Sequence, residues 1–409
     1  MSSSATHASP SAPPKAPIHV EPFVLPSIGG VDKDGISVAE ARENIKRDLR
    51  SDTATIPTPE MATAMAEASV GDNVMNEDLT TASFEASVAS LCGKEAGLYV
   101  PSGTLSNQLC LRTWLLQPPY AVICDYRAHI HRHEAGGVAY HSGAAVELIQ
   151  PSNGAYLRWV DIEPQIALDD GDVHAAPTKI VSLENTLQGT ILPQEEILTI
   201  RRGLDELKAQ GHDIKLHLDG ARLWNVSAAT GKSMKELCEP FDSVSLCFSK
   251  GLGAPIGSMM LGPQALIRKA HHFRKLFGAG MRQSGFIAAA ARVALTSHFH
   301  KLAYTHELAR WTANALEQLG VRITMPVDTN MVFIDTTPLG FDARMLVERA
   351  QAERGIKLGG ARLVVHHQIV PETMSDLVQI VAQLKAENEG VKLESKGKSD
   401  GYPSMATRK

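Results

Sequence analysis

The residue best placed for covalent chemistry is Lys250, which follows the apolar run SVSLCFS (243–249) and precedes a glycine-rich turn. A lysine at the tip of a buried strand can form an imine with an aldehyde, and its neighbour Ser249 can donate a hydrogen bond. A surface lysine in a tight loop would show the same local sequence. Lys250 is therefore a candidate nucleophile that needs partners elsewhere in the chain.

Asp219 and Arg222 follow another apolar run, IKLHL (214–218). A carboxylate at the end of a strand can pair with a protonated ring nitrogen. An arginine three residues later can bind a substrate carboxylate through its planar guanidinium. The alternative is that Asp219 only caps a helix, which is common after a strand.

Ser102, Gly103 and Thr104 stand between the apolar run AGLYV (96–100) and a helical pattern. The N–H groups at a helix N-terminus, together with hydroxyl groups, can bind a phosphate. A plain helix cap fits the same three residues, so this motif indicates a phosphate site only in combination with the motifs around Lys250 and Asp219.

His129, His131 and His133 alternate along one short segment. No cysteine and no HExxH pattern accompanies them, so we expect no metal and one histidine that stacks on a ring or moves a proton. A phosphate site, a stacking histidine, an aspartate and a strand-end lysine, in this order, are the contacts that pyridoxal phosphate requires.

The elements that must position these residues alternate between strand-length apolar runs and helical patterns, the latter at 106–116 and 192–211. This alternation predicts an α/β fold with a mostly parallel sheet and helices on both faces, whose ligands gather at the carboxyl ends of the strands. The predicted strands are 96–100, 121–125, 146–150, 179–185, 214–220, 243–249 and 257–262.

Beyond residue 295, two helical patterns flank the run NMVFIDT (330–336), and a short strand-like run follows at 362–367. This arrangement predicts a smaller α+β domain at the C-terminal side. The predicted division is a disordered tail and arm at 1–46, a large domain at 47–295, a small domain at 296–386 and a flexible tail at 387–409.

Composition excludes several classes of protein. The 409 residues hold 40 Lys and Arg against 45 Asp and Glu, a formal net charge of −5 that does not suit a nucleic-acid or anionic-membrane partner. No apolar stretch reaches the roughly 18–20 residues of a membrane span. The five cysteines are odd in number and form no CxxC pair, which favours a reducing compartment. We therefore expect a cytoplasmic protein.

Eight segments resemble the low-specificity L-threonine aldolases, which belong to the β-eliminating lyase group of fold-type-I pyridoxal phosphate enzymes. The resemblance covers about residues 47–385 with the spacings intact. It implies an aminotransferase-like large domain, a small C-terminal domain, and a homotetramer built from dimers with shared active sites. The segments are LRSDTAT (49–55), GDNVMNED (71–78), GKEAGLYVPSGTLSNQ (93–108), RAHIHRHEAGG (127–137), SLENTLQG (182–189), LHLDGARLWN (216–225), SKGLGAPIGS (249–258) and GAGMRQSG (278–285).

The resemblance assigns roles residue by residue. Lys250 matches the Schiff-base lysine, Asp219 the partner of the pyridine nitrogen, and His129 the residue stacked on the cofactor ring. The implied phosphate contacts are Gly103, Thr104 and Ser249. The implied pocket for the substrate carboxylate is Ser51, Arg222 and Arg362, and the residues implied to complete the neighbouring subunit's site are Lys275 and Arg282.

The chain departs from the family after ENT (184–186), where members that cleave threonine well often carry a histidine. Leu187 and Gln188 stand there instead. Glutamine can hydrogen-bond the substrate hydroxyl but cannot take its proton, so His129, or water held near it and Gln188, is the candidate base. Two activities follow: cleavage of L-threonine or L-allo-threonine to glycine and acetaldehyde, or racemisation of a small amino acid such as alanine. A catalytically silent binding protein is a third hypothesis.

Overall fold

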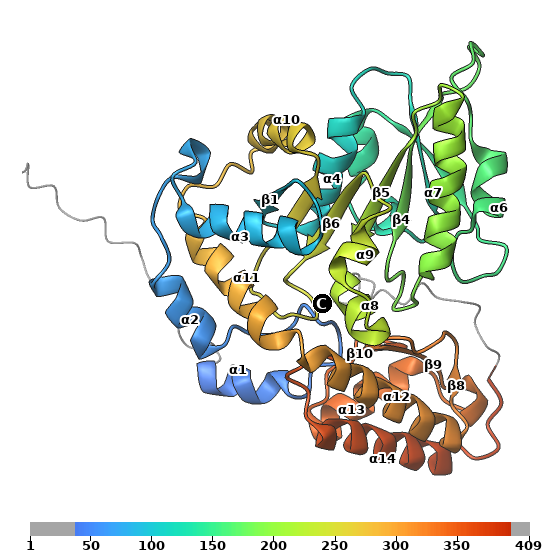
Figure 1. The fold of residues 1–409 in the computed structure, drawn as a ribbon. Coiled ribbons are helices and arrows are strands. Elements are labelled where there is room, and N and C mark those ends of the chain that lie inside the picture. Colours follow the sequence, from blue (N-terminus) through green and yellow to red (C-terminus); the bar gives the residue numbers. More distant parts are fainter. Residues whose placement is uncertain (1–36, 394–409) are drawn as a thin grey trace, which may run out of the picture.

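The computed structural model describes residues 37–393, which form two bodies side by side (Figure 1). The tails predicted at the two ends fall largely at 1–36 and 394–409, outside the described residues. Along the described part of the chain, no helix has the length and apolar character needed to cross a membrane.

The larger body is built on a seven-stranded sheet. Only β7 runs against its two neighbours, and the remaining adjacent pairs are parallel. The mostly parallel α/β fold predicted from the sequence is thereby confirmed. In spatial order the strands are β1 (Ala96–Val100), β7 (Ser258–Gly262), β6 (Ser243–Cys247), β5 (Lys215–Gly220), β4 (Thr178–Glu184), β2 (Ala121–Asp125) and β3 (Ala145–Ile149).

Helices cover both faces of this sheet, because successive side chains of a strand point to opposite sides. On β7, Met259 and Leu261 join the core formed with α3 (Leu79–Leu91), α7 (Gln194–Ala209) and α11 (Gly285–His298). Met260 faces the other way, toward α4 (Gly103–Trp114) and α10 (Gln264–Leu276). This is why the strands read as nearly continuous apolar runs.

Shorter elements connect these layers. Two of them, α8 (Leu223–Thr230) and α9 (Met234–Cys238), link β5 to β6. The others are α1 (Val38–Ile45), α2 (Pro59–Ala66), η1 (Asn73–Met75), α5 (His129–Arg132), η2 (Val138–Ser142), α6 (Trp159–Ile162) and η3 (Glu163–Gln165).

The smaller body holds a three-stranded antiparallel sheet in the order β10-β9-β8. β9 lies within the run 330–336 and β10 within the strand-like run 362–367, whereas β8 has two residues, too few to show a period in the sequence. The elements are β8 (Arg322–Ile323), β9 (Met331–Asp335), β10 (Arg362–Val364), α12 (Lys301–Leu319), η4 (Thr337–Leu339), α13 (Ala343–Arg354) and α14 (Pro371–Glu387).

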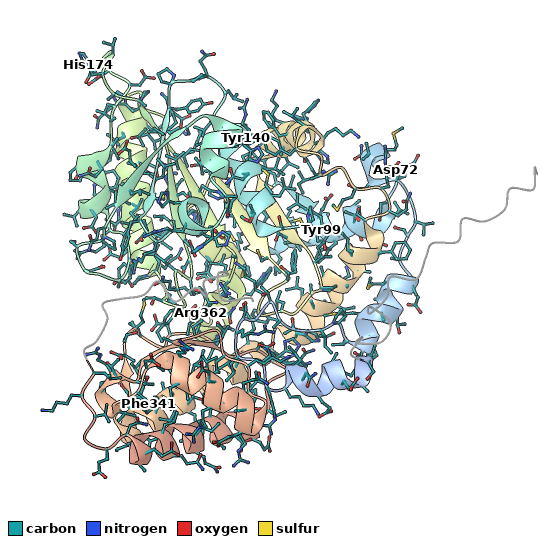
Figure 2. The ribbon with its side chains drawn as sticks, turned by 180° about the vertical axis from the view of Figure 1, so that it is seen from behind. Asp72, Tyr99, Tyr140, His174, Phe341 and Arg362 are labelled. Atoms are coloured by element: carbon teal, nitrogen blue, oxygen red, sulfur yellow. The ribbon has the colours of Figure 1, made fainter. Side chains whose placement is uncertain are left out.

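The segment that precedes α2 ties the two bodies together. Leu49, inside the range predicted for the large domain, is fully buried in the core of the small body. Its N–H donates to the carbonyl of Lys357, and its carbonyl accepts from the N–H of Val364, both at 2.9 Å. A short extended segment with one apolar residue has no periodicity that could reveal this. Its placement leads Ser51 to Thr53 into the junction where Arg362 also lies (Figure 2).

Gly203, in the interior of α7, allows α7 to pack closely on α6. A methyl group there would lie 2.3 Å from Cε2 of Trp159. Alanine is favoured over glycine in a helix by about 1 kcal/mol, but such an overlap costs about 1–3 kcal/mol. We expect Gly203→Ala to lower the melting temperature by about 3 °C, measured by circular dichroism.

The same substitution made in a Trp159→Leu background provides the control. There the indole is gone, and only the gain in helix propensity remains. Gly203→Ala should then be neutral or stabilising. A similar loss of stability in both backgrounds would contradict packing against Trp159 as the cause.

Candidate active site

One cavity of about 310 Å³ opens at the edge where the carboxyl ends of the parallel strands meet. It brings together six of the predicted site residues, which come from four separate parts of the chain. They are Gly103, Thr104, His129, Asp219, Ser249 and Lys250; the other lining residues are Thr53, Pro101, Ser102, Asn107, Ala221, Cys247, Pro255 and Ile256.

One end of the cavity is the N-terminus of α4. Ser102 caps this helix by accepting from the N–H of Leu105 at 3.2 Å. The first N–H groups of a helix have no partner within it, so Gly103 and Thr104 present donors suited to an anion. A methyl group on Gly103 would lie 2.6 Å from Sγ of Cys247. Glycine is therefore required for this close approach of the helix to β6.

Asp219 supplies a buried carboxylate at another wall of the cavity. Its Oδ1 accepts from the N–H of Ala221 at 3.1 Å, and its Oδ2 accepts from Nδ2 of Asn107 at 2.8 Å. These donors fix the plane of the carboxylate. Because Asp219 lies within β5, its backbone is also held by the sheet.

His129 is held at two points by carboxylates. Its backbone N–H donates to Oε2 of Glu184 at 2.8 Å, and its ring Nδ1 lies 2.9 Å from Oε1 of the buried Glu134. Burial alone lowers the pKa of His129, but the hydrogen bond to Glu134 and the charge of Asp219 raise it above the ordinary value. Burial and the charge of Asp219 also raise the pKa of Glu184.

Asn107 and Glu134 were missed by the sequence analysis. Nδ2 of Asn107 donates to Oε1 of Glu134 at 2.9 Å as well as to Asp219, and Nε2 of Gln108 donates to Oε2 of Glu134 at 2.6 Å. The available signal was the position of Asn107, one helical turn after Gly103 and thus on the same face of α4.

The alternating histidines take different positions. His129 is the one whose ring joins other potential ligands, with atoms of His129, Glu134 and Asp219 all within 4.8 Å of one another. The ring of His133 packs against that of His129 with centroids 5.5 Å apart. Within this group, His129 is hydrogen-bonded directly to Glu134, and Asn107 donates to both Glu134 and Asp219.

Arg222, predicted to bind a substrate carboxylate, forms a bidentate ion pair with Asp52. Nε and Nη2 of Arg222 lie 2.8 and 2.7 Å from the two oxygens of Asp52, which is fully buried. Burial opposes the charge of Asp52, but the charge and hydrogen bonds of Arg222 outweigh it and lower the pKa of Asp52 to about 2. The sequence analysis quoted Asp52 within LRSDTAT without giving it a role.

Neither Arg362 nor Ser51 belongs to the set of residues that lines the cavity. Nη2 of the buried Arg362 donates to the carbonyl of Arg50 at 3.3 Å. Oγ of Ser51 lies 2.9 Å from Oγ1 of Thr53. The three predicted carboxylate-binding residues thus converge on the segment 50–53.

Lys275 and Arg282 do not reach the cavity of their own chain. Both are exposed, Lys275 on α10 and Arg282 in the loop after it. Nη1 of Arg282 lies 2.9 Å from Oδ2 of Asp72, which Figure 2 places at the edge of the large body. The family resemblance implies that these two residues help to complete the site of a neighbouring subunit, which stays a prediction.

The two positions that depart from the family histidine differ in environment. Leu187 is buried and lines a small internal cavity with Asp125 and Glu184. Gln188 is half-buried, has a φ of 52°, and lies outside the lining of the larger cavity. The two positions therefore differ in environment, and a histidine would have different surroundings at each of them.

Asp52 provides a test of the electrostatics. Its pKa falls from an ordinary 3.8 to about 2 on folding, so its contribution to stability is present above pH 4 and is lost as the pH falls toward 2. Asp52→Asn leaves Arg222 buried without its counter-charge and should cost about 3 kcal/mol at pH 7. The free energy of unfolding, measured in urea, should differ between wild type and Asp52→Asn by a constant amount from pH 5 to 8 and by less at pH 3. A difference that grows on acidification would contradict the ion pair of Asp52 with Arg222.

Comparisons with known proteins identify the family of this chain. Residues 48–338 match the model of the beta-eliminating lyase family. A low-specificity L-threonine aldolase of Candida albicans is 46% identical over 82% of this chain and 89% of its own length. An alanine racemase of Cochliobolus carbonum is 37% identical over 86% of this chain and 94% of its own length. A threonine aldolase structure from Leishmania major, 20% identical, has the same fold, with a TM-score of 0.70 over 83% of this chain and 99% of that one. The chain therefore belongs to the beta-eliminating lyase family, as its motifs predicted.

Proposed function

We propose that this protein is a pyridoxal-phosphate-dependent lyase that cleaves L-threonine and L-allo-threonine to glycine and acetaldehyde. The observation that carries the proposal is the single cavity that holds Lys250, Asp219, His129 and the N-terminus of α4 together. The similarity to low-specificity L-threonine aldolases at 46% identity supports the choice of substrate.

The groups around the cavity fit this cofactor. The α4 N-terminus and Ser249 would bind the phosphate, and the close approach that Gly103 permits shapes that end of the cavity. Asp219 would hold a proton on the ring nitrogen, His129 would stack on the ring, and Lys250 would hold the aldehyde carbon covalently. When bound, the cofactor accepts the electron pair of the bond that breaks at the substrate Cα.

Binding of the substrate carboxylate selects which bond breaks. Arg222 and Arg362, with Ser51, would fix the carboxylate at the junction of the two bodies, and Asp52 holds the guanidinium of Arg222 in one orientation. For an aldol cleavage, the Cα–Cβ bond must stand perpendicular to the cofactor ring while a base takes the β-hydroxyl proton. His129, or water held near it and Gln188, is the candidate base.

A second activity, racemisation of alanine or a similar small amino acid, is the alternative. Breaking the Cα–H bond and returning the proton on the other face needs the same carboxylate clamp and the same lysine. Two observations favour keeping it: the 37% identity to an alanine racemase, and Leu187 and Gln188 at the positions of the family histidine.

We extend the proposal to assembly and location. Lys275 and Arg282 are exposed and are not among the residues that line their own cavity, which supports a homotetramer of dimers in which they complete a neighbour's site. Five buried cysteines without a disulfide support a cytoplasmic location. The proposed cleavage would make the enzyme a source of glycine. We also retain the division into a large domain at 47–295 and a small domain at 296–386.

A product assay tests the activity. Purified protein with added pyridoxal phosphate should release acetaldehyde from L-threonine and L-allo-threonine, and Lys250→Ala should lose both this release and the visible absorbance of the bound cofactor. Borohydride reduction and mass spectrometry should place the cofactor on Lys250. Conversion of L- to D-alanine with no acetaldehyde would favour the racemase. A colourless protein indifferent to the cofactor would refute both activities.

Gln188 allows a gain of function. Histidine tolerates a positive φ better than most side chains, so Gln188→His keeps the turn and adds a group that can take a proton. We expect a roughly tenfold or greater rise in acetaldehyde release from threonine. Leu187→His is the matched control: it puts an imidazole in an apolar site and should lower the melting temperature without this gain. Equal rates for wild type and Gln188→His would show that position 188 does not reach the substrate.

A further inference from the structure

The carboxylates of Asp219 and Glu134 are both buried, and one side chain lies between them. Nδ2 of Asn107 is 2.8 Å from Oδ2 of Asp219 and 2.9 Å from Oε1 of Glu134. Two carboxylates buried at such short range repel each other unless donors separate them. The amide of Asn107 supplies one N–H to each, and it carries no charge that could be lost.

The orientation of this amide follows from its third contact. Oδ1 of Asn107 lies 3.2 Å from Nε2 of His217, which is fully buried. A carbonyl oxygen turned toward two carboxylates would be repelled, so the NH₂ group faces them and the carbonyl faces His217. Nε2 of His217 must then carry a hydrogen and donate it to Asn107.

Groups behind His217 support the same assignment. Burial lowers the pKa of His217 to about 4, so the ring is neutral near pH 7. Because Nε2 carries the hydrogen that faces Asn107, Nδ1 is the acceptor. Oγ of Ser243 lies 3.0 Å from Nδ1, and the indole N–H of Trp114 donates to this same oxygen at 3.1 Å. Donation therefore runs in one direction, from Trp114 through Ser243 and His217 to Asn107, which strengthens each bond.

Asn107 also lines the cavity beside Asp219. Residues 217 and 219 of β5 point to the same side of the sheet, the side that α4 covers, so the network behind Asn107 and the acid at the cavity share one face. Asn107 and the N–H of Ala221 together leave Asp219 one plane in which its carboxylate can lie.

We propose that Asn107 is a positioning residue, which aims the carboxylate of Asp219 at the ring nitrogen of the cofactor and fixes the carboxylate of Glu134 against the ring of His129. This inference rests on the proposed function, since it assumes that pyridoxal phosphate binds in the cavity. Asn107 acts through its neighbours and takes no part in proton transfer.

The experiment compares two cofactors in equilibrium binding to apoprotein: pyridoxal phosphate, and its analogue in which the ring nitrogen is replaced by C–H. A hydrogen bond between the ring nitrogen and a well-placed carboxylate should make wild type prefer pyridoxal phosphate by about tenfold or more. In Asn107→Leu, which has a similar shape but no donor, the preference should fall below about threefold. General damage to the cavity would weaken binding of both cofactors equally and leave the preference intact.

Gln108→Leu is the matched control, since Gln108 is a neighbouring buried amide on α4 that donates to Glu134 alone. It should retain the wild-type preference. If Asn107→Leu does not fold, as judged by its melting curve, Asn107→Ser is measured in the same way and should also show a reduced preference.

Two results would overturn the inference: an undiminished preference in the folded Asn107 variant, or no preference in wild type. Acetaldehyde release by wild type is scored separately. An active enzyme with an unaltered preference in the variant would therefore refute the role of Asn107 alone. A wild-type protein that binds neither cofactor would refute the proposed function and this inference with it.

Discussion

Burial of negative charge is the constraint on which this site depends. Asp52, Glu134 and Asp219 are each almost entirely removed from solvent, and each is matched with nitrogen donors. Asp52 takes the guanidinium of Arg222, whereas Glu134 and Asp219 share Asn107. A buried carboxylate without such donors would be far less stable, so the donors and the acids must be understood as one unit.

The sheet brings this unit together. The strands β4 and β5 are parallel and in register, with Glu184 beside Asp219 at their carboxyl ends. The helix α4 then crosses the sheet with its N-terminus at the cavity and with Asn107 one turn further on. Donors for a phosphate and donors for a carboxylate thus come from successive turns of one helix, which fixes the spacing between the two ends of the cavity.

The sequence predicted the fold and the residues that face the cavity better than it predicted the residues that hold those side chains in place. Lys250, Asp219 and Gly103 stand beside apolar runs, where a change of period marks the end of a strand, and each lines the cavity. Asn107 and Glu134 lie within helical or loop sequence, and they contact each other and Asp219 or Gln108 across separations of 26 to 112 residues. Such contacts depend on how the layers pack, which a local pattern does not record.

The contacts of the segment around Asp52 were also not predicted from the sequence, and they link the two bodies mechanically. Leu49 is hydrogen-bonded to the small sheet, and three residues later Asp52 forms its ion pair with Arg222 of the large body. At most about 3.5 Å of chain per residue separates the two anchors, so this link has little slack. Any rotation of one body against the other must therefore stretch a charged contact that is shielded from water. A hinge motion of the two bodies would in this way change the alignment of Arg222, because only a few residues link the two anchors.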